Sequence, residues 1–397
     1  MIIRENYLKL LIDFKDKSVI KVITGIRRCG KSTLMLQFID FLKKSGIEDD
    51  NIIYINLESF QYDYIKDYIH LYELIEQKIS KNCRYYVFID EVQNVEQFEK
   101  AVNSLTIDYN VDLYITGSNA YLLSSEISTL LSGRYVEINV FPLSFKEYAS
   151  QWSNQDHETT FNRYMKYGGF PFLAHEQNEN IINNYLDGIY NTVVLKDIIK
   201  RNNIKEINQL ENILKMVLSS VGSLISPHSI SKMFKNEGKR ITNETVERYI
   251  EMFCNAFIIN KAVRFDIKGK GYLKTLNKYY VTDLGLRNNL LGYRQIEVTH
   301  ALENIIYYEL LRRGYKVDIG KVNNSEVDFI ARKNNTIEYY QVSYSVNQSK
   351  ETLERELNPY HQISDHYQKF LITMDKDYIT DFNGITKINA IDWLLRD

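Results

Sequence analysis

The sequence predicts an α/β fold in which a parallel sheet comes first and further helical and mixed domains follow. The first observation is an alternation of short apolar runs with helical patterns up to residue 140. The second is a glycine-rich loop, "GIRRCGKS", which separates the first apolar run from the first helical pattern. Strands that alternate with helices are typical of a parallel sheet that is covered on both faces.

Short runs rich in Val, Ile, Tyr and Phe are expected to form the strands of this sheet. These runs are residues 19–24, 51–57, 85–90, 111–116 and 135–140. The segments between them repeat apolar residues at helical spacing, as Leu34, Phe38 and Leu42 do in the first segment. The expected helices are residues 32–44, 64–82 and 95–107.

Helical patterns dominate from residue 151 onward. Residues 158–201 are expected to be helical, with a break at "YGGFPF" (167–172), where two glycines and a proline force a turn. Residues 206–254 contain three helical patterns, and residues 257–282 predict a β-hairpin that turns at Gly269 and Gly271. The remainder begins with a helix at 299–313, mixes strands and helices, and ends with a helix near 390–396.

Composition excludes several classes of protein. The three cysteines are widely separated, which argues against a disulfide framework and a structural zinc site. No apolar run approaches the roughly 20 residues of a membrane span, and the N-terminus lacks the apolar region of a signal peptide. We therefore expect a cytoplasmic protein with no membrane partner. The formal net charge is −2, yet residues 201–285 hold 14 basic and 8 acidic residues, which makes this segment a candidate for contact with a polyanion.

The loop after the first strand matches G-x-x-x-x-G-K-[ST], with Gly25, Gly30, Lys31 and Ser32 at the defining positions. Its glycines allow backbone N–H groups to converge on a phosphate, and the helix that follows directs its positive end at the same anion. Lys31 is expected to bridge the β- and γ-phosphates of ATP, and the Ser32 hydroxyl to bind Mg²⁺. The alternative is a glycine turn with an exposed lysine. Three neighbours are further expected nucleotide-binding residues: Arg28, Cys29 and Thr33.

Two acids end the third strand, in "YYVFIDEVQ". Asp90 is expected to hold Mg²⁺, and Glu91 to orient and deprotonate the attacking water. The fourth strand ends in "ITGSNA", which places Thr116, Ser118 and Asn119 at that strand end, and one of them is expected to contact the γ-phosphate or the water, with a simple turn as the alternative. Arg134 precedes the fifth strand. It is a candidate for stabilising charge on the transferred phosphoryl group, either in its own chain or in a neighbouring one.

Several motifs together resemble a family of AAA+ ATPases from archaea and bacteria that are usually called predicted ATPases. The motifs are "VITGIRRCGKSTL", "FIDEVQ", "YITGSNAYLLSSEISTLLSGRYVEINVFPLSFKEY", "YGGFP" and "YNTVVLKDIIKR". The resemblance implies that Lys31, Asp90, Glu91 and a polar residue of "GSN" are the ATPase residues. It also implies four domains: an AAA+ P-loop core (1–150), a helical lid (151–205), a winged-helix domain (206–292) and a restriction-endonuclease-like α/β domain (293–397).

The basic segment leaves two interpretations open. In the third helix of the segment, Val246, Tyr249, Ile250 and Phe253 should face the core, and the outward face then carries three glutamates and an arginine. That face is poorly suited to a DNA major groove. Contacts from the hairpin and from other lysines to the DNA backbone remain one interpretation, and a module that packs against protein is the other.

The C-terminal domain has an incomplete set of nuclease residues. The resemblance directs attention to Glu303 and Asp328 as Mg²⁺ ligands, but Gln341 and Ser343 stand where a carboxylate and a lysine would be needed. We therefore expect a nuclease-like fold without ordinary nuclease activity.

The resulting hypothesis is a Mg²⁺-dependent ATPase that couples its nucleotide state to movement of the later domains, with a hinge at Gly168 and Gly169. A nucleotide-switched DNA-binding or regulatory module with little turnover is the alternative, and a small-molecule kinase is a weaker one. Homo-oligomerisation is left open.

Overall fold

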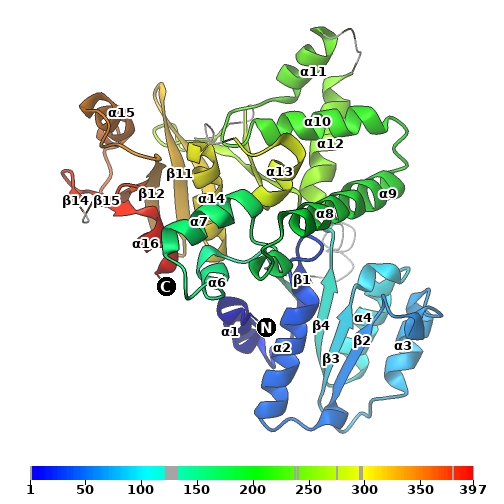
Figure 1. Cartoon of the computed structure of the whole chain (residues 1–397). Coiled ribbons are helices and arrows are strands. Elements are labelled where there is room, and N and C mark those ends of the chain that lie inside the picture. Colours follow the sequence, from blue (N-terminus) through cyan, green and yellow to red (C-terminus); the bar gives the residue numbers. More distant parts are fainter. Residues whose placement is uncertain are drawn as a thin grey trace. The chain divides into compact units, whose positions relative to one another are not determined.

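The computed structural model describes residues 2–120, 133–236, 238, 241–273, 276–294, 298–377 and 380–396, without the side chains of residues 194–196 and 380 (Figure 1). The chain forms two compact units. The first unit comprises Met1–Phe141 together with Asn255–Phe257, and the second comprises Pro142–Cys254 and Ile258–Asp397. Each unit is described by itself below.

The first unit is built on a five-stranded, wholly parallel sheet in the order β2-β3-β4-β1-β5. This sheet confirms the predicted α/β class, and all of the expected strands form. The strands are β1 (Ile20–Thr24), β2 (Ile52–Asn56), β3 (Tyr85–Asp90), β4 (Val111–Gly117) and β5 (Tyr135–Asn139). The helices are α1 (Glu5–Phe14), α2 (Lys31–Lys44), α3 (Tyr68–Glu76) and α4 (Phe98–Asp108).

Alternating side chains of the strands bury two separate layers. On one face Phe88 of β3 stacks on Tyr114 of β4 with ring centroids 4.7 Å apart, and Phe38 of α2 lies 5.1 Å from Tyr114. On the other face, aliphatic residues of the strands pack with α3 and α4, where Leu71 and Val102 are fully buried. Both faces of the sheet are therefore apolar, as a parallel sheet covered by helices requires.

The helix predicted at 64–82 is shorter in the structure. Asp67 ends the preceding segment and accepts hydrogen bonds from the backbone N–H groups of Ile69 and His70, so α3 begins at Tyr68. Such an N-cap satisfies amide groups that have no partner within the helix.

The second unit begins with helices. They are α6 (Phe145–Ala149), α7 (His157–Tyr167), α8 (Glu179–Tyr190), a π-helical stretch (Asn191–Ile199) and α9 (Lys200–Asn202), followed by α10 (Ile207–Ser219), α11 (Pro227–Asn236), α12 (Asn243–Asn255) and α13 (Leu284–Leu291). The predicted faces of α12 are confirmed, because Val246, Tyr249, Ile250 and Phe253 are buried while Glu244, Glu247, Arg248 and Glu251 are exposed.

The glycine pair at 168–169 ends α7 at a tightly packed contact. A Cβ atom on Gly168 would overlap the carboxylate of Asp283, and one on Gly169 would lie 2.6 Å from the Leu143 carbonyl oxygen. Asp283 accepts hydrogen bonds from the N–H groups of Gly169 (2.7 Å) and Gly285 (2.9 Å). Burial raises the pKa of Asp283 to about 6, against the opposing effect of these bonds. Because these glycines have no side chain, Asp283 and Leu143 can pack closely against their backbone. This packing role differs from the hinge that the sequence predicted.

The segment predicted as a hairpin contributes to two sheets. Strands β6 (Ile259–Ala262) and β9 (Lys278–Val281) pair with each other as an antiparallel pair. Between them, β7 (Arg264–Asp266) and β8 (Gly271–Tyr272) form an antiparallel hairpin tip, and β7 pairs in parallel with β10 of the C-terminal region. The tip is therefore an edge of the larger sheet.

The C-terminal region forms most of an eight-stranded mixed sheet with the order β14-β15-β13-β12-β11-β10-β7-β8. Its strands are β10 (Lys316–Val322), β11 (Ser325–Lys333), β12 (Thr336–Val342), β13 (Gln368–Thr373), β14 (Thr380–Asp381) and β15 (Ile385–Asn389). Its helices are α14 (Val298–Arg312), α15 (Lys350–His361) and α16 (Ala390–Leu395). Figure 1 shows α14 beside β11 and β12.

Candidate functional site

The glycine-rich loop joins the carboxyl end of β1 to the amino end of α2. Gly25 has φ +142°, and a Cβ atom there would overlap the carbonyl oxygen of Val140. Gly30 has φ +104° and is the N-cap residue of α2. Both positions therefore require glycine, because a side chain would clash at the first and be strained at the second.

Lys31 lies inside the loop, and only 4% of the residue is exposed. Its Nζ donates to the carbonyl oxygens of Gly25 (3.0 Å) and Ile26 (3.3 Å), and lies 3.9 Å from Oε1 of Glu91. The loop therefore holds this ammonium group close to the acid at the end of β3.

Asp90 and Glu91 are buried at the carboxyl end of β3, with 1% and 7% of each residue exposed. Asp90 Oδ2 accepts a hydrogen bond from the Tyr54 hydroxyl (3.1 Å), and Asp90 Oδ1 accepts one from the Thr116 hydroxyl. The Thr116 hydroxyl also accepts from the Glu91 N–H (2.9 Å). In the sheet, β4 lies between β3, which ends at the acids, and β1, which leads into the loop. Thr116 therefore links the two acids to the strand that neighbours β1.

Ser118 and Asn119 follow β4 and are both buried, so the structure places them at the same edge of the sheet as the loop. The Gln93 side-chain amide donates to Glu91 Oε2 and, at 3.5 Å, to Ser118 Oγ. Gln93 therefore orients the Glu91 carboxylate. Gln93 was not predicted from the sequence, although its place two residues after the acid was the available signal.

The remaining loop residues differ in exposure. Ser32 is half-buried in the first turn of α2, whereas Arg28 and Thr33 are exposed. Cys29 is fully buried, and burial raises the pKa of its thiol. A neutral, inaccessible thiol is a filler and is poorly suited to redox chemistry.

Arg4 supports the loop from the N-terminal segment. Its guanidinium is buried and donates to the carbonyl oxygens of Cys29 (3.2 Å) and Phe141 (2.9 Å). These bonds tie the loop to the residue that follows β5. The sequence analysis did not identify Arg4, because no local pattern marks a residue that acts 25 positions away.

Arg134 lies at the opposite edge of the sheet. Its carbonyl oxygen accepts from the Ile20 N–H (2.8 Å), and Tyr135 pairs with Ile20 at the amino end of β1. The phosphate loop begins after Thr24, which is about 15 Å further along a parallel strand. The exposed Arg134 side chain therefore does not reach the loop of its own chain. The other interpretation, in which Arg134 stabilises the phosphoryl group bound to a neighbouring chain, stays a prediction.

The residues present at the end of β3 and in the loop fit a bound Mg²⁺. Asp90 and Glu91 are buried carboxylates. Among the described residues, Lys31 is the only cation within ion-pair distance of either carboxylate. One negative charge is therefore left to be compensated. Mg²⁺ is usually held by one or two carboxylates together with substrate phosphates.

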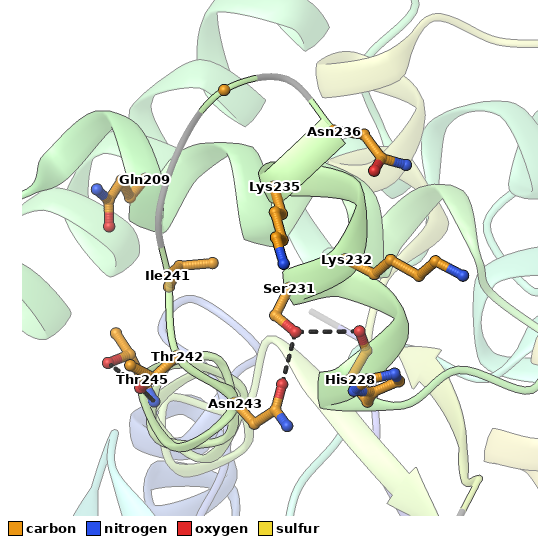
Figure 2. A pocket seen from close by; sticks show the side chains of 11 residues that line it. Gln209, His228, Ser231, Lys232, Lys235, Asn236, Ile241, Thr242, Asn243 and Thr245 are labelled. Carbon is orange, nitrogen blue, oxygen red and sulfur yellow. Dashed lines mark hydrogen bonds between the residues drawn. The ribbon is translucent and has the colours of Figure 1, made fainter.

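A cavity of about 1190 Å³ lies between α11 and α12 in the basic segment (Figure 2). Lys232 and Lys235 line it from α11 beside polar side chains, and none of its described lining residues is acidic. Ser231 Oγ donates to the His228 carbonyl oxygen within α11 (3.0 Å) and to Asn243 Oδ1 (2.5 Å), and the second bond joins α11 to α12. The cavity is therefore cationic, whereas the exposed face of α12 is mostly acidic.

The expected nuclease positions also come together in space. Glu303 of α14, Asp328 of β11 and Gln341 of β12 line an open cavity of about 490 Å³. Ser343 is buried just beyond β12 and is not among the residues that line this cavity. A lysine from the hairpin, Lys278, lies in the same cavity and was not expected there.

Comparisons with known proteins agree with the geometry of the first unit. A family model described as an AAA domain matches residues 17–149, and one described as a domain of unknown function, DUF8612, matches residues 158–297. An uncharacterized protein of Haemophilus influenzae is 43% identical over 401 residues, which cover 100% of this chain and 99% of that protein. The uncharacterized protein MJ1544 of Methanocaldococcus jannaschii is 32% identical over 360 residues, which cover 86% of this chain and 78% of that protein.

A solved structure described as the Walker-type ATPase PABY2304 of Pyrococcus abyssi is similar with a TM-score of 0.51. The alignment covers 73% of this chain and 96% of that chain at 15% sequence identity, and it therefore supports the fold alone. No helix among the described residues is long and apolar enough to cross a membrane.

Proposed function

This chain belongs to the family of the H. influenzae and M. jannaschii proteins, and we propose that it is an AAA+ ATPase that binds and hydrolyses ATP with Mg²⁺. The observation that carries the proposal is the 3.9 Å approach of Lys31 in the glycine loop to Glu91 at the end of β3. This distance supports the proposal, because an ammonium that binds phosphate would then lie next to a carboxylate suited to act on water.

Each residue of the site has a role in this proposal. The loop backbone, the dipole of α2 and the ammonium of Lys31 bind the phosphates, with Thr33 and Arg28 at the rim. The Ser32 hydroxyl and Asp90 hold Mg²⁺, which supplies charge neutralisation for the phosphates. Glu91 accepts a proton from the water, and Ser118 and Asn119 contribute polar groups from β4. Tyr54, Thr116 and Gln93 are positioning residues, because they bond to the acids.

The first test measures binding separately from turnover. Lys31→Ala is expected to weaken binding of ATP with Mg²⁺ at least about tenfold and to abolish phosphate release, because the site loses its phosphate-binding cation. Titration calorimetry measures the binding, and Lys43→Ala, which removes an exposed lysine from the far end of the same helix, is the matched control. Wild-type protein that gives no heat with any nucleoside triphosphate and Mg²⁺ would contradict the proposal.

Arg134 fits this function only from a neighbouring molecule. It is exposed and lies at the edge of the sheet away from the loop of its own chain. In the proposal, a second copy of the chain presents its Arg134 to the phosphates, so turnover depends on a homo-oligomer. Nucleotide-dependent movement of the helical, winged-helix and nuclease-like domains inferred from the sequence belongs to the same proposal.

The alternative function, a nucleotide-switched DNA-binding module, is favoured by one observation. The cavity between α11 and α12 carries Lys232 and Lys235 and no described carboxylate (Figure 2). Phosphate contacts to such a surface give affinity that depends on salt and little on sequence. The acidic exposed face of α12 argues against reading bases with that helix.

A double charge reversal tests this alternative. Lys232→Glu/Lys235→Glu is expected to reduce affinity for duplex DNA at least about tenfold at low salt, and to reduce the slope of log affinity against log salt by about 2, because two phosphate contacts are lost. Fluorescence anisotropy measures both quantities. Lys43→Glu/Lys44→Glu on α2 is the control for the change in total charge. Equal affinities of the wild type and the two double variants for duplex DNA would exclude this cavity as the DNA-binding surface.

A further inference from the structure

The cavity between α14 and β11 holds its own cation. Nζ of Lys278 lies 2.9 Å from Glu303 Oε1, 2.7 Å from Glu326 Oε1 and 3.6 Å from Asp328 Oδ1. The restriction-endonuclease resemblance assigns a metal ion to Glu303 and Asp328. In this structure a buried ammonium group faces the same carboxylate oxygens.

Asp328, Gln341 and Glu356, which also line the cavity, take part in further hydrogen bonds. Asp328 Oδ2 accepts from the Val342 N–H (2.9 Å), and Gln341 Oε1 accepts from the Asp328 N–H (3.3 Å). The Gln341 amide donates to Glu356 Oε2 (2.9 Å). Gln341 therefore uses its oxygen to hold the backbone of β11, and as a neutral amide it contributes no charge to a cation site.

Lys278 is held in place by the strand that carries it. Within β9, Lys278 pairs with Ala262 of β6. Three residues further on, the Asn304 side chain bonds to both the N–H (2.8 Å) and the carbonyl oxygen (2.9 Å) of Val281. Tyr280 donates its hydroxyl to Glu303 Oε1 (2.6 Å), and its ring stacks on Tyr307 of α14 at 4.2 Å. The backbone of β9, the strand that carries Lys278, is thus fastened to α14, the helix that carries Glu303.

The chemistry of the two cations decides which one the cavity accepts. An ammonium has three donors, and Nζ lies within hydrogen-bond distance of the Glu303 and Glu326 carboxylates and within ion-pair distance of Asp328. Mg²⁺ demands near-octahedral oxygen ligands at about 2.0–2.1 Å. A divalent ion bound to Glu303 and Asp328 would lie within a few ångströms of a positive charge, where repulsion is strong in a buried site. The residues present therefore do not fit a metal ion.

We propose that Lys278 is the resident counter-ion of the nuclease-like site: it takes the place of a divalent cation and fastens β9 to α14 and β11. This inference is independent of the ATPase proposal, because no residue of the phosphate loop takes part. Removal of the ammonium leaves three carboxylates that face one another, and that arrangement favours uptake of a divalent cation.

Mn²⁺ binding to the nucleotide-free full-length protein tests the proposal, with the free ion measured by electron paramagnetic resonance. Lys278→Met keeps the length of the side chain and removes its charge. It is expected to bind one Mn²⁺ per chain at concentrations at least about tenfold below those at which the wild type takes up any ion at this site. The double variant Lys278→Met/Asp328→Asn should lose that ion, and Lys316→Met, an exposed lysine on β10, should behave like wild type.

Two results would overturn the proposal. One is Mn²⁺ bound to the wild type and lost in Asp328→Asn, because a metal would then enter beside Lys278. The other is a folded Lys278→Met protein, verified by circular dichroism, that takes up no additional Mn²⁺. If Lys278→Met does not fold, the comparison of wild type with Asp328→Asn decides, and equal Mn²⁺ binding by these two proteins supports the proposal.

Discussion

Glu91→Gln is expected to leave ATP binding near the wild-type level and to lower hydrolysis by about 10²- to 10⁴-fold. The carboxylate lies 3.9 Å from Lys31 and is oriented by Gln93, and in the proposed function it therefore serves beside the phosphates as the proton acceptor for water. The amide keeps the size of the side chain but cannot accept the proton at neutral pH. Phosphate release under saturating ATP and Mg²⁺ measures the loss, and calorimetry measures the retained binding.

A matched substitution separates this effect from a general change in charge. Glu96→Gln removes an exposed carboxylate five residues away and should hydrolyse ATP at the wild-type rate. Gln93→Ala should give an intermediate rate, because Glu91 remains and loses only its orienting hydrogen bond. A wild-type rate in Glu91→Gln would remove Glu91 from the mechanism, whereas no turnover by the wild type would leave the alternative of a nucleotide switch.

Asp112→Ala is expected to lower the free energy of unfolding of the first unit by about 3–5 kcal/mol. Lys21 of β1 is fully buried, and its ammonium forms an ion pair with Asp112 of β4. Burial lowers the pKa of Lys21, against the opposing effect of Asp112. Asp112 Oδ2 also accepts from the Asp16 N–H (2.8 Å) and the Tyr114 hydroxyl (2.9 Å). Removal of the carboxylate leaves the buried Lys21 ammonium and two hydrogen-bond donors without Asp112 as their partner. Buried polar and charged groups that lose a partner lower the free energy of unfolding strongly.

Urea unfolding followed by far-ultraviolet circular dichroism measures this change. Both tryptophans of the chain, Trp152 and Trp393, belong to the second unit, so their fluorescence reports on that unit separately. Lys21→Met/Asp112→Leu should recover most of the loss, because it removes both charges together. Asp40→Ala breaks an exposed pair on α2 and should cost about 0.5 kcal/mol or less. A similarly small effect of Asp112→Ala would show that the buried pair does not stabilise the sheet.

Local patterns in the sequence were sufficient to predict the core of the first unit. Continuous apolar runs predicted the strands of the parallel sheet, and the loop with Gly25, Gly30 and Lys31 was located by its spacing. Asp90 and Glu91 could be assigned for the same reason, because the carboxyl ends of parallel strands share one edge. These features depend on residues that are close in the chain, and periodicity and motif spacing report on such residues directly.

Contacts between distant segments could not be predicted in this way. Arg4 reaches the loop from the N-terminal segment, and Tyr54 reaches Asp90 from a different strand. Lys278 occupies the cavity where the sequence showed only a missing lysine at Ser343. Strand register, and not distance along the chain, separates Arg134 from the phosphate loop.

The sequence alone therefore determined the α/β class, the phosphate loop and the paired acids, because each arises from the order of neighbouring residues. Only the tertiary structure decided which side chains complete these groups: Gln93 on Glu91, Thr116 on Asp90, and Lys278 among the carboxylates of the second unit. The physical reason is that a buried charge must find a partner, and folding supplies that partner from whichever segment packs against it.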